Sequence, residues 1–396
     1  MTKEELYDRL KVDKSLIDEI SFNPYFIPVE SALEREIVVS GENKISMGTN
    51  DYLGLSNNPD VKKAAFYAVE KYGVSMCGTP IVIGHSEIHQ MLEKKTAQFL
   101  KQDESVVFPS CYQANMSIFQ LLSNGEDVII ADKEIHSSLL NGIVLTKAEF
   151  NVFPHNDIDK LDKVLARNKD KRMRFVVVEG MYSTYGDTAK MKEICDLCKK
   201  HNAISIVDEA HAIGVIGDEG RGILELCDVY DEVDIITGSY GKAVGTFGGF
   251  LAGKSKVIDI FRYSSPMYFY STALPPAICA STVKALEIIP QSNNTRKRIN
   301  NLAASARESL KKMKLNVTES STPLISVIFK NTKYTLTVSK ILFENGIYAV
   351  PFVPPSVPKK SPRIRFTFNA HLCDENVDCL VDVFKKIKLK KPELFD

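Results

Sequence analysis

Phe175-Val176-Val177-Val178-Glu179-Gly180 is the first of three short stretches that decide the fold. The second, Ile204-Ser205-Ile206-Val207, runs directly into Asp208-Glu209-Ala210-His211. The third, Val233-Asp234-Ile235-Ile236, leads into Thr237-Gly238-Ser239-Tyr240-Gly241-Lys242. Short, continuous apolar runs with a helical stretch between them are typical of parallel strands that are buried on both faces. Residues 172–250 therefore predict an α/β fold organised around a mostly parallel sheet.

Polar side chains follow these strands directly: Asp208, His211, Ser239 and Lys242. Ligands of such sheets bind outside the carboxyl ends of the strands. A partly desolvated lysine can act there as a Schiff-base nucleophile, and pyridoxal 5′-phosphate (PLP) needs both such a lysine and a carboxylate against its ring nitrogen. Alone, Asp208 could cap a helix and Lys242 could be a solvated surface lysine. Together, beside the small residues Gly238 and Gly245, they favour a PLP site.

Several motifs around these strands strengthen this interpretation. Val207-Asp208-Glu209-Ala210-His211, Gly217, Gly220-Arg221-Gly222 and Gly238-Ser239-Tyr240-Gly241-Lys242 together resemble the PLP-dependent α-oxoamine synthases. This family includes serine palmitoyltransferase, 8-amino-7-oxononanoate synthase and 2-amino-3-ketobutyrate CoA ligase. The resemblance extends from about Asn23 to the C-terminus. It implies a fold-type I PLP transferase with a seven-stranded sheet, divided into an N-terminal arm (1–55), a large PLP-binding domain (56–290) and a small C-terminal α/β domain (291–396).

The resemblance also implies a reaction. An α-amino acid and an acyl-CoA thioester would undergo a decarboxylating Claisen-type condensation to an α-amino ketone, CoA and CO2. Lys242 would carry the cofactor and act as general base, Asp208 would keep the ring nitrogen protonated, and His211 would hydrogen-bond the ring O3′ or the acyl carbonyl. Alternatives are an amino-ketone signal synthase of the same family and a fold-type I aminotransferase. A non-catalytic PLP sensor and a nucleotide-dependent oxidoreductase are more distant rivals.

Further roles follow from the same resemblance. Cys111 and Tyr112 open a predicted helix, whose free N–H groups and dipole suit a phosphate. His136 would stack on the pyridine ring, and Ser271 with Thr272 would reach the phosphate of a partner subunit, which implies a homodimer. The expected cofactor-binding residues are Cys111, Tyr112, His136, Ser183, Asp208, His211, Ser239, Lys242, Ser271 and Thr272.

Two residues are expected to bind the amino-acid substrate. Arg365 would hold its carboxylate in a planar, bidentate pair, and Asn50 would assist. From the residues alone, Asn50 could equally be a turn residue before a helix, and Arg365 could form a surface salt bridge. Gly78-Thr79-Pro80 departs from the family's usual Gly-Ser-Arg, so a substrate contact from this loop is not carried over.

Composition limits the remaining possibilities. The 396 residues contain 50 basic and 50 acidic side chains, which gives no general attraction to nucleic acid or acidic membranes. No apolar run approaches the length of a membrane span. Eight cysteines without a signal peptide indicate reduced thiols in the cytoplasm. Cys195-Asp196-Leu197-Cys198 lies within a predicted helix, so core packing is favoured over a zinc or redox site.

Periodicity predicts the other elements. Residues 1–22 have the pattern of one amphipathic helix, and residues 37–39 and 44–47 that of a hairpin. The remaining predictions are helices at 60–72, 86–101, 191–201 and 296–314, a strand at 106–108 that enters a helix at Cys111, and strands at 128–132, 324–329 and 348–351.

Overall fold

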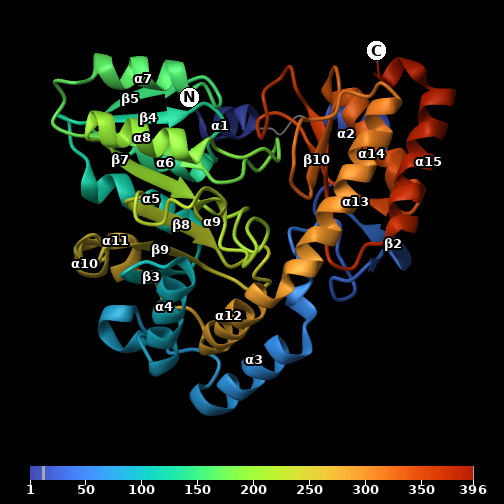
Figure 1. Cartoon of the computed structure of the whole chain (residues 1–396). Coiled ribbons are helices and arrows are strands. Elements are labelled where there is room, and N and C mark those ends of the chain that lie inside the picture. The colour runs from blue at the N-terminus through green and yellow to red at the C-terminus, as the bar shows by residue number, and fades with distance from the viewer. Residues whose placement is uncertain (11–13, 396) are drawn as a thin grey trace.

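A seven-stranded sheet forms the centre of the computed structural model, which describes residues 1–10 and 14–395. Its strand order is β3-β9-β8-β7-β6-β4-β5 (Figure 1). The strands are β3 (Glu104–Phe108), β4 (Val128–Asp132), β5 (Glu149–Phe153), β6 (Arg174–Glu179), β7 (Ile204–Asp208), β8 (Ile235–Ser239) and β9 (Gly249–Gly253). Strand β9 runs antiparallel to both of its neighbours, and the other pairs are parallel. The predicted α/β class and the mostly parallel, seven-stranded sheet are confirmed.

Both faces of the sheet are covered by helices, which explains why its central strands are apolar throughout. Successive side chains of a strand point to opposite faces. Val177 and Phe175 therefore join a core with α5 (Cys111–Leu122), α6 (Ser137–Val144) and α10 (Ser255–Ser264). Val176 and Val178 join the other core, with α3 (Pro59–Tyr72), α4 (Glu87–Leu100), α7 (Ile158–Arg167), α8 (Met191–His201), α9 (Ile223–Cys227) and α12 (Pro276–Ile288).

The predicted CxxC helix belongs to this second core. Cys195 and Cys198 are both buried on the inner face of α8, which confirms core packing. Both thiols are free, as are the other cysteines of the chain. Within residues 1–10 and 14–395, no helix combines the length and the apolar character that crossing a membrane requires.

A separate core lies in the C-terminal part, among α13 (Asn293–Lys312), α14 (Thr332–Glu344), α15 (Asp374–Lys390) and the antiparallel strands β10 (Leu324–Ile328), β13 (Arg363–Thr367) and β12 (Pro351–Phe352). Figure 1 shows these helices beside the large sheet. The predicted hairpin is present as β1 (Glu36–Val39) and β2 (Glu42–Ser46), and β2 also pairs with β11 (Ile347–Tyr348). The prediction of one strand over 348–351 was wrong, because β11 and β12 belong to different sheets.

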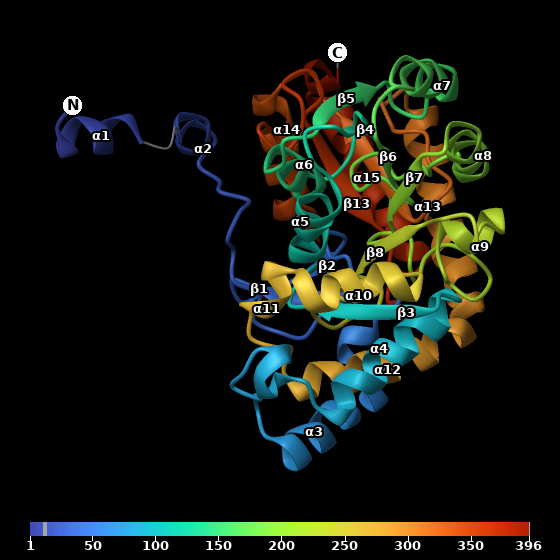
Figure 2. The ribbon, with the colours of Figure 1, turned by 90° about the vertical axis from the view of Figure 1, so that its left-hand side faces the viewer.

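The N-terminal segment also differs from its prediction. In place of one helix over 1–22, the structure has α1 (Lys3–Arg9) and α2 (Ser15–Ile20), and residues 11–13 lie outside the described residues. Helix α1 buries no side chain, so it has no packing against a core to stabilise a longer helix. Helix α2 lies against α14, where Phe22 and Phe343 place their ring centroids 5.2 Å apart. Figure 2 shows α1 standing away from the large sheet.

Candidate active site

The carboxyl ends of β6, β7 and β8 meet at one cavity of about 310 Å3. Glu179 of β6 lies opposite Asp208 of β7, and Asp208 lies opposite Thr237 of β8. The first turn of α5 and the start of α6 complete the walls. Seven predicted site residues line this cavity: Cys111, Tyr112, His136, Asp208, His211, Ser239 and Lys242. Four of them, Asp208, His211, Ser239 and Lys242, were expected here because they follow strand ends, and the other three were expected from the family resemblance.

Asp208 is fixed in orientation by donors on both of its oxygens. Ala210 N–H donates to Oδ1 at 2.8 Å, and Asn115 Nδ2 donates to Oδ2 at 2.7 Å. Asn115 in turn donates to Ser138 Oγ at 2.9 Å. Asn115 was not among the predicted site residues. The signal was available, since Asn115 lies one helical turn after Cys111 and therefore on the same face of α5.

Lys242 is partly buried and lines the same cavity as this carboxylate. Burial lowers the pKa of its amine, which is partly opposed by the negative charges of Asp208 and Glu179. A lowered pKa raises the fraction of free amine, the form that reacts with a carbonyl. Glu179 is buried in the same wall, and burial together with Asp208 raises its pKa well above the ordinary value.

The first turn of α5 forms the opposite end of the cavity. Ser110 caps the helix by accepting from Gln113 N–H at 3.2 Å. Gly249 packs so closely on Cys111 that an added Cβ would lie 2.2 Å from the Cys111 nitrogen. Burial raises the pKa of the Cys111 thiol well above its ordinary value, so the thiol stays protonated and is a poor nucleophile. Cys111 is a small residue at the cavity wall, in the first turn of α5.

His211 and His136 occupy different positions around the cavity. His136 is exposed, and its Nδ1 lies 2.7 Å from Ser138 Oγ. His211 is buried, and burial lowers its pKa well below the ordinary value, so the ring is neutral. Its Nδ1 lies 3.0 Å from the hydroxyl of the fully buried Tyr52. Burial raises the Tyr52 pKa to about 12, so this hydroxyl keeps its proton and is available as a donor to Nδ1. With Tyr52 as the donor, the ring proton of His211 is at Nε2.

Replacing Tyr52 with phenylalanine should lower kcat about tenfold, because the ring of His211 loses the contact that fixes its tautomer and orientation. Binding of the amino-acid substrate should change little. Nitrogen-15 spectra of the histidine rings check the cause directly: wild-type His211 should carry its proton at Nε2, and the variant should populate both tautomers. An unchanged His211 spectrum in the variant would remove this role of Tyr52.

Asn50, Ser183 and Arg365 are brought together beside the cavity. Arg365 is buried on β13 and donates to Asn50 Oδ1 and to the Ser183 carbonyl, each at 3.0 Å. Ser183 N–H donates to Glu179 Oε2 at 3.3 Å, and Glu179 lines the cavity. Residues from the N-terminal arm, the large sheet and the C-terminal strands therefore form one connected group. The surface salt bridge considered for Arg365 is excluded by its burial.

Ser271 and Thr272 do not line this cavity. Ser271 Oγ accepts from Gln113 Nε2 at 2.9 Å, and Thr272 is exposed. Within the chain, therefore, neither hydroxyl lies against the residues that surround Lys242.

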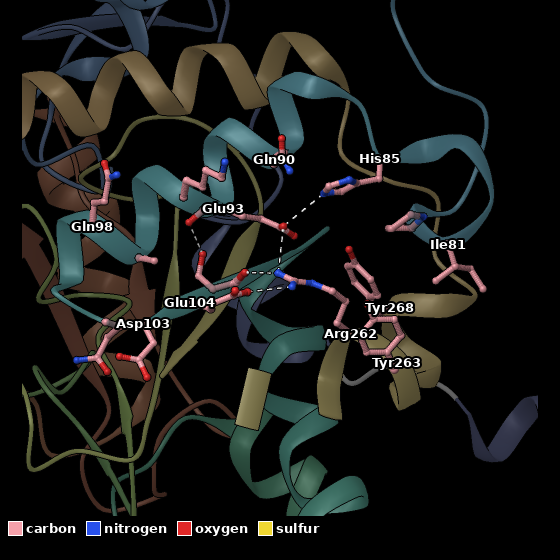
Figure 3. Close-up of a pocket in the computed structure, with 15 residues that line it drawn as sticks. Ile81, His85, Gln90, Glu93, Gln98, Asp103, Glu104, Arg262, Tyr263 and Tyr268 are labelled. Carbon is pink, nitrogen blue, oxygen red and sulfur yellow. Dashed lines mark hydrogen bonds and ion pairs between the residues drawn. The ribbon is translucent and has the colours of Figure 1, made fainter. Parts of the chain in front are cut away.

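A second cavity, of about 520 Å3, lies between α4, β3 and α10 (Figure 3). It contains none of the predicted site residues. Its centre is an ion-pair cluster in which Arg262 contacts Glu93 at 3.3 Å and Glu104 at 2.9 Å, while His85 contacts Glu93 at 3.3 Å. The Glu93 side chain is only 7% exposed. This cluster joins α4 to α10, and we assign it a structural role.

Replacing Arg262 with methionine should lower the free energy of unfolding by about 2–4 kcal/mol, because Glu93 would keep a buried charge without its guanidinium partner. Chemical denaturation followed by circular dichroism measures the change. The double variant Arg262→Met with Glu93→Gln is the matched control and should regain most of the loss. Equal stability of the single variant and the wild type would contradict this assignment.

Comparison with known proteins agrees with the geometry. Residues 42–384 match the family model described as aminotransferase class I and II. The chain belongs to this family. It is 36% identical over 360 residues to an 8-amino-7-oxononanoate synthase from Thermoanaerobacter pseudethanolicus, with 91% of each chain covered. Its fold matches a serine palmitoyltransferase from S. paucimobilis with bound PLP and myriocin, with a TM-score of 0.94, 27% identity and coverage of 98% and 99%. A Sphingomonas wittichii serine palmitoyltransferase gives a TM-score of 0.92 at 29% identity, with coverage of 98% and 97%.

These similarities confirm the predicted α-oxoamine synthase family and its PLP dependence. The cavity fits the cofactor: Lys242 lies at one wall, the fixed carboxylate of Asp208 at another, and a helix N-terminus at the end. Among the described residues, Glu179 Oε1 is buried without a hydrogen-bond partner, and Glu179 lines the cavity. A polar group therefore remains there for a bound molecule to satisfy.

Proposed function

We propose that this enzyme condenses an α-amino acid with an acyl-CoA thioester and releases CoA and CO2, giving an α-amino ketone. A carbon–carbon bond forms between the amino-acid α-carbon and the acyl carbonyl carbon. The α C–H bond, the thioester C–S bond and the carboxylate C–C bond break. The sulfur leaves as the CoA thiol, and a proton takes the place of CO2 at the α-carbon. The observation that carries the proposal is the convergence of Lys242, Asp208 and His211 on one cavity, with Arg365 beside it.

Each side chain has a distinct task. Arg365 and Asn50 hold the substrate carboxylate, Asp208 holds a proton at the ring nitrogen, and Lys242 removes the α-proton. His211 donates from Nε2 to the acyl carbonyl oxygen or to the ring O3′. When bound, PLP supplies an electron-withdrawing ring that accepts the charge left at the α-carbon. The lowered pKa of Lys242 supports its use as a base near neutral pH.

A homodimer is part of the proposal. Ser271 and Thr272 lie away from the cavity of their own chain, which agrees with hydroxyls that serve the phosphate of a second copy. Sedimentation velocity should give twice the mass of the 44.2 kDa chain. We also propose a cytoplasmic location, which the free thiols of all the cysteines support. The division into residues 1–55, 56–290 and 291–396 stays a prediction.

A thiol-release screen tests the reaction. Purified enzyme with PLP is given pairs of amino acids and acyl-CoAs of increasing chain length, and free CoA is measured with a thiol reagent. Release of CoA and CO2 in equal amounts is expected for at least one pair. Conversion of a 2-oxo acid to an amino acid without thiol release would favour the aminotransferase alternative. An amino-ketone signal synthase would be recognised by its product in the same screen.

A further inference from the structure

A histidine outside the cavity connects three neighbouring strand ends of the large sheet. His155 follows β5, Asp132 is the last residue of β4, and Asp187 lies in the segment after β6. His155 Nδ1 is 2.9 Å from Asp132 Oδ1, and Nε2 is 2.8 Å from Asp187 Oδ2. Asp132 is buried, and the His155 ring contacts the Tyr182 ring edge-on at 4.4 Å.

The two carboxylates determine the charge of this histidine. Burial alone would lower the pKa of His155, but Asp132 and Asp187 outweigh burial and raise the pKa to about 10. Its other ionisable neighbours are Tyr182 and Tyr185, whose rings pack against it, and the groups that share a shallow cavity with it, Asp157, Asp159 and Lys190. His155 is therefore an imidazolium at neutral pH, and both of its contacts are charge-assisted.

The segment held by His155 leads directly to the substrate-binding arginine. Residues 182–187 lie between the large sheet and the C-terminal strands. The Ser183 carbonyl accepts from Arg365 at 3.0 Å, and the Thr184 carbonyl accepts from Ser326 Oγ at 2.8 Å. The Gly186 carbonyl accepts from Ser320 at 2.6 Å and from Thr322 at 2.7 Å. Asn156 adds a donor to Asp187 at 3.0 Å. The segment is thus held at Asp187 by His155 and, from Ser183 to Gly186, by β10, β13 and the loop before β10.

We propose that His155 is a positioning residue: by bridging Asp132 and Asp187 it fixes segment 182–187, whose backbone orients Arg365 toward the carboxylate of the amino-acid substrate. The inference rests on the proposed function for the identity of that substrate. His155 lines no part of the cavity around Lys242, so its effect passes through Ser183 and Arg365. Its stabilising charge is fully present below the ordinary pKa of histidine and is lost as pH rises through about 10.

The test replaces His155 with glutamine in the PLP-loaded enzyme. Amino-acid binding, measured from the change in cofactor absorbance without any thioester, should weaken about 10- to 100-fold, and the KM for the amino acid should rise in parallel. The KM for the thioester should stay within about twofold of the wild type, because the change affects only the binding of the amino-acid carboxylate by Arg365. His201→Gln is the matched control, since His201 also pairs with an aspartate, Asp162 at 2.6 Å, but on the far end of α8. It should bind the amino acid as the wild type does.

Two further measurements keep the inference testable if His155→Gln does not fold. Asp187→Asn, at a half-exposed position, should weaken amino-acid binding in the same selective way. In nitrogen-15 spectra of the wild type, the His155 ring should remain doubly protonated at pH 8.5. Unchanged amino-acid binding in either variant, or titration of His155 near its ordinary pKa of about 6.5, would overturn the inference. Failure of the proposed function would look different: no thioester would release thiol in the wild type, while the binding measurements would still report on His155.

Discussion

Replacing Lys242 with alanine is expected to lower thiol release by about 10,000-fold or more. In the proposed mechanism the side chain has two tasks that no neighbour can take over. It would be the amine that joins the cofactor and the base that removes the α-proton. Among the residues lining the cavity it is the only lysine. Steady-state assays at saturating amino acid and thioester measure the loss, and added PLP should not restore activity.

The control for this variant is Lys254→Ala. Lys254 is exposed, follows β9 and faces Asp103 at 3.8 Å, outside the cavity. Its removal should change kcat by less than about twofold, as expected for a weak surface ion pair. If the Lys242 variant kept more than about a hundredth of wild-type turnover, a different group would have to be the base.

Replacing Asp208 with asparagine should lower kcat about 100- to 1,000-fold, because an amide cannot stabilise a protonated ring nitrogen as a carboxylate does. The shape of the site should be largely kept, since asparagine has nearly the same volume. The bonds from Ala210 N–H and Asn115 Nδ2 hold the carboxylate toward the cavity in the wild type. Steady-state kinetics give the loss in kcat, and bound PLP per chain shows whether the cofactor is still present.

Asp234→Asn is the matched control. Asp234 precedes β8 and accepts from Ser205 N–H and Ser205 Oγ, at the amino end of the same strands. Removing its charge should affect stability but leave kcat within about threefold of the wild type. A loss at Asp208 no larger than the loss at Asp234 would contradict the role of a ring-nitrogen partner.

The centre of the fold was predictable because its signals are local. The apolar runs that became β6, β7 and β8 are buried on both faces, and burial on both faces requires an unbroken apolar sequence. Because polar residues come soon after these strands in the sequence, Asp208 and Lys242 were predicted at the carboxyl-end edge of the sheet. The antiparallel β9 was not predicted. Its residues, Gly249 to Gly253, begin and end with glycine, which is depleted in strands.

The contacts that were missed join residues far apart in the chain. Tyr52 meets His211 across 159 positions, and Arg365 meets Asn50 across 315. The periodicity of a short stretch of sequence carries no information about contacts between such distant residues. The resemblance to a family named Asn50 and Arg365 as substrate residues, and the structure brings them within hydrogen-bond distance. His155 gave no sequence signal, since a lone histidine after a strand is ordinarily structural, and its two aspartates come from different strand ends.

The prediction for the N-terminal segment was wrong because a local pattern was present without a tertiary contact to match it. Its apolar spacing predicted one helix, but Leu6 and Leu10 remain exposed in the structure. Periodicity indicates a helix only when a partner surface receives its apolar face. Within a single chain α1 has no such surface, because none of its side chains is buried.

We propose that Lys242 joins PLP covalently, in a site where Asp208 keeps the ring electron-poor. Borohydride reduction of the PLP-loaded enzyme, followed by digestion and peptide mass spectrometry, locates that bond. The predicted result is one phosphopyridoxyl group per chain, located on Lys242. Reduced cofactor on a different lysine, or no adduct in an enzyme that still releases thiol, would exclude Lys242 as the residue that carries the cofactor.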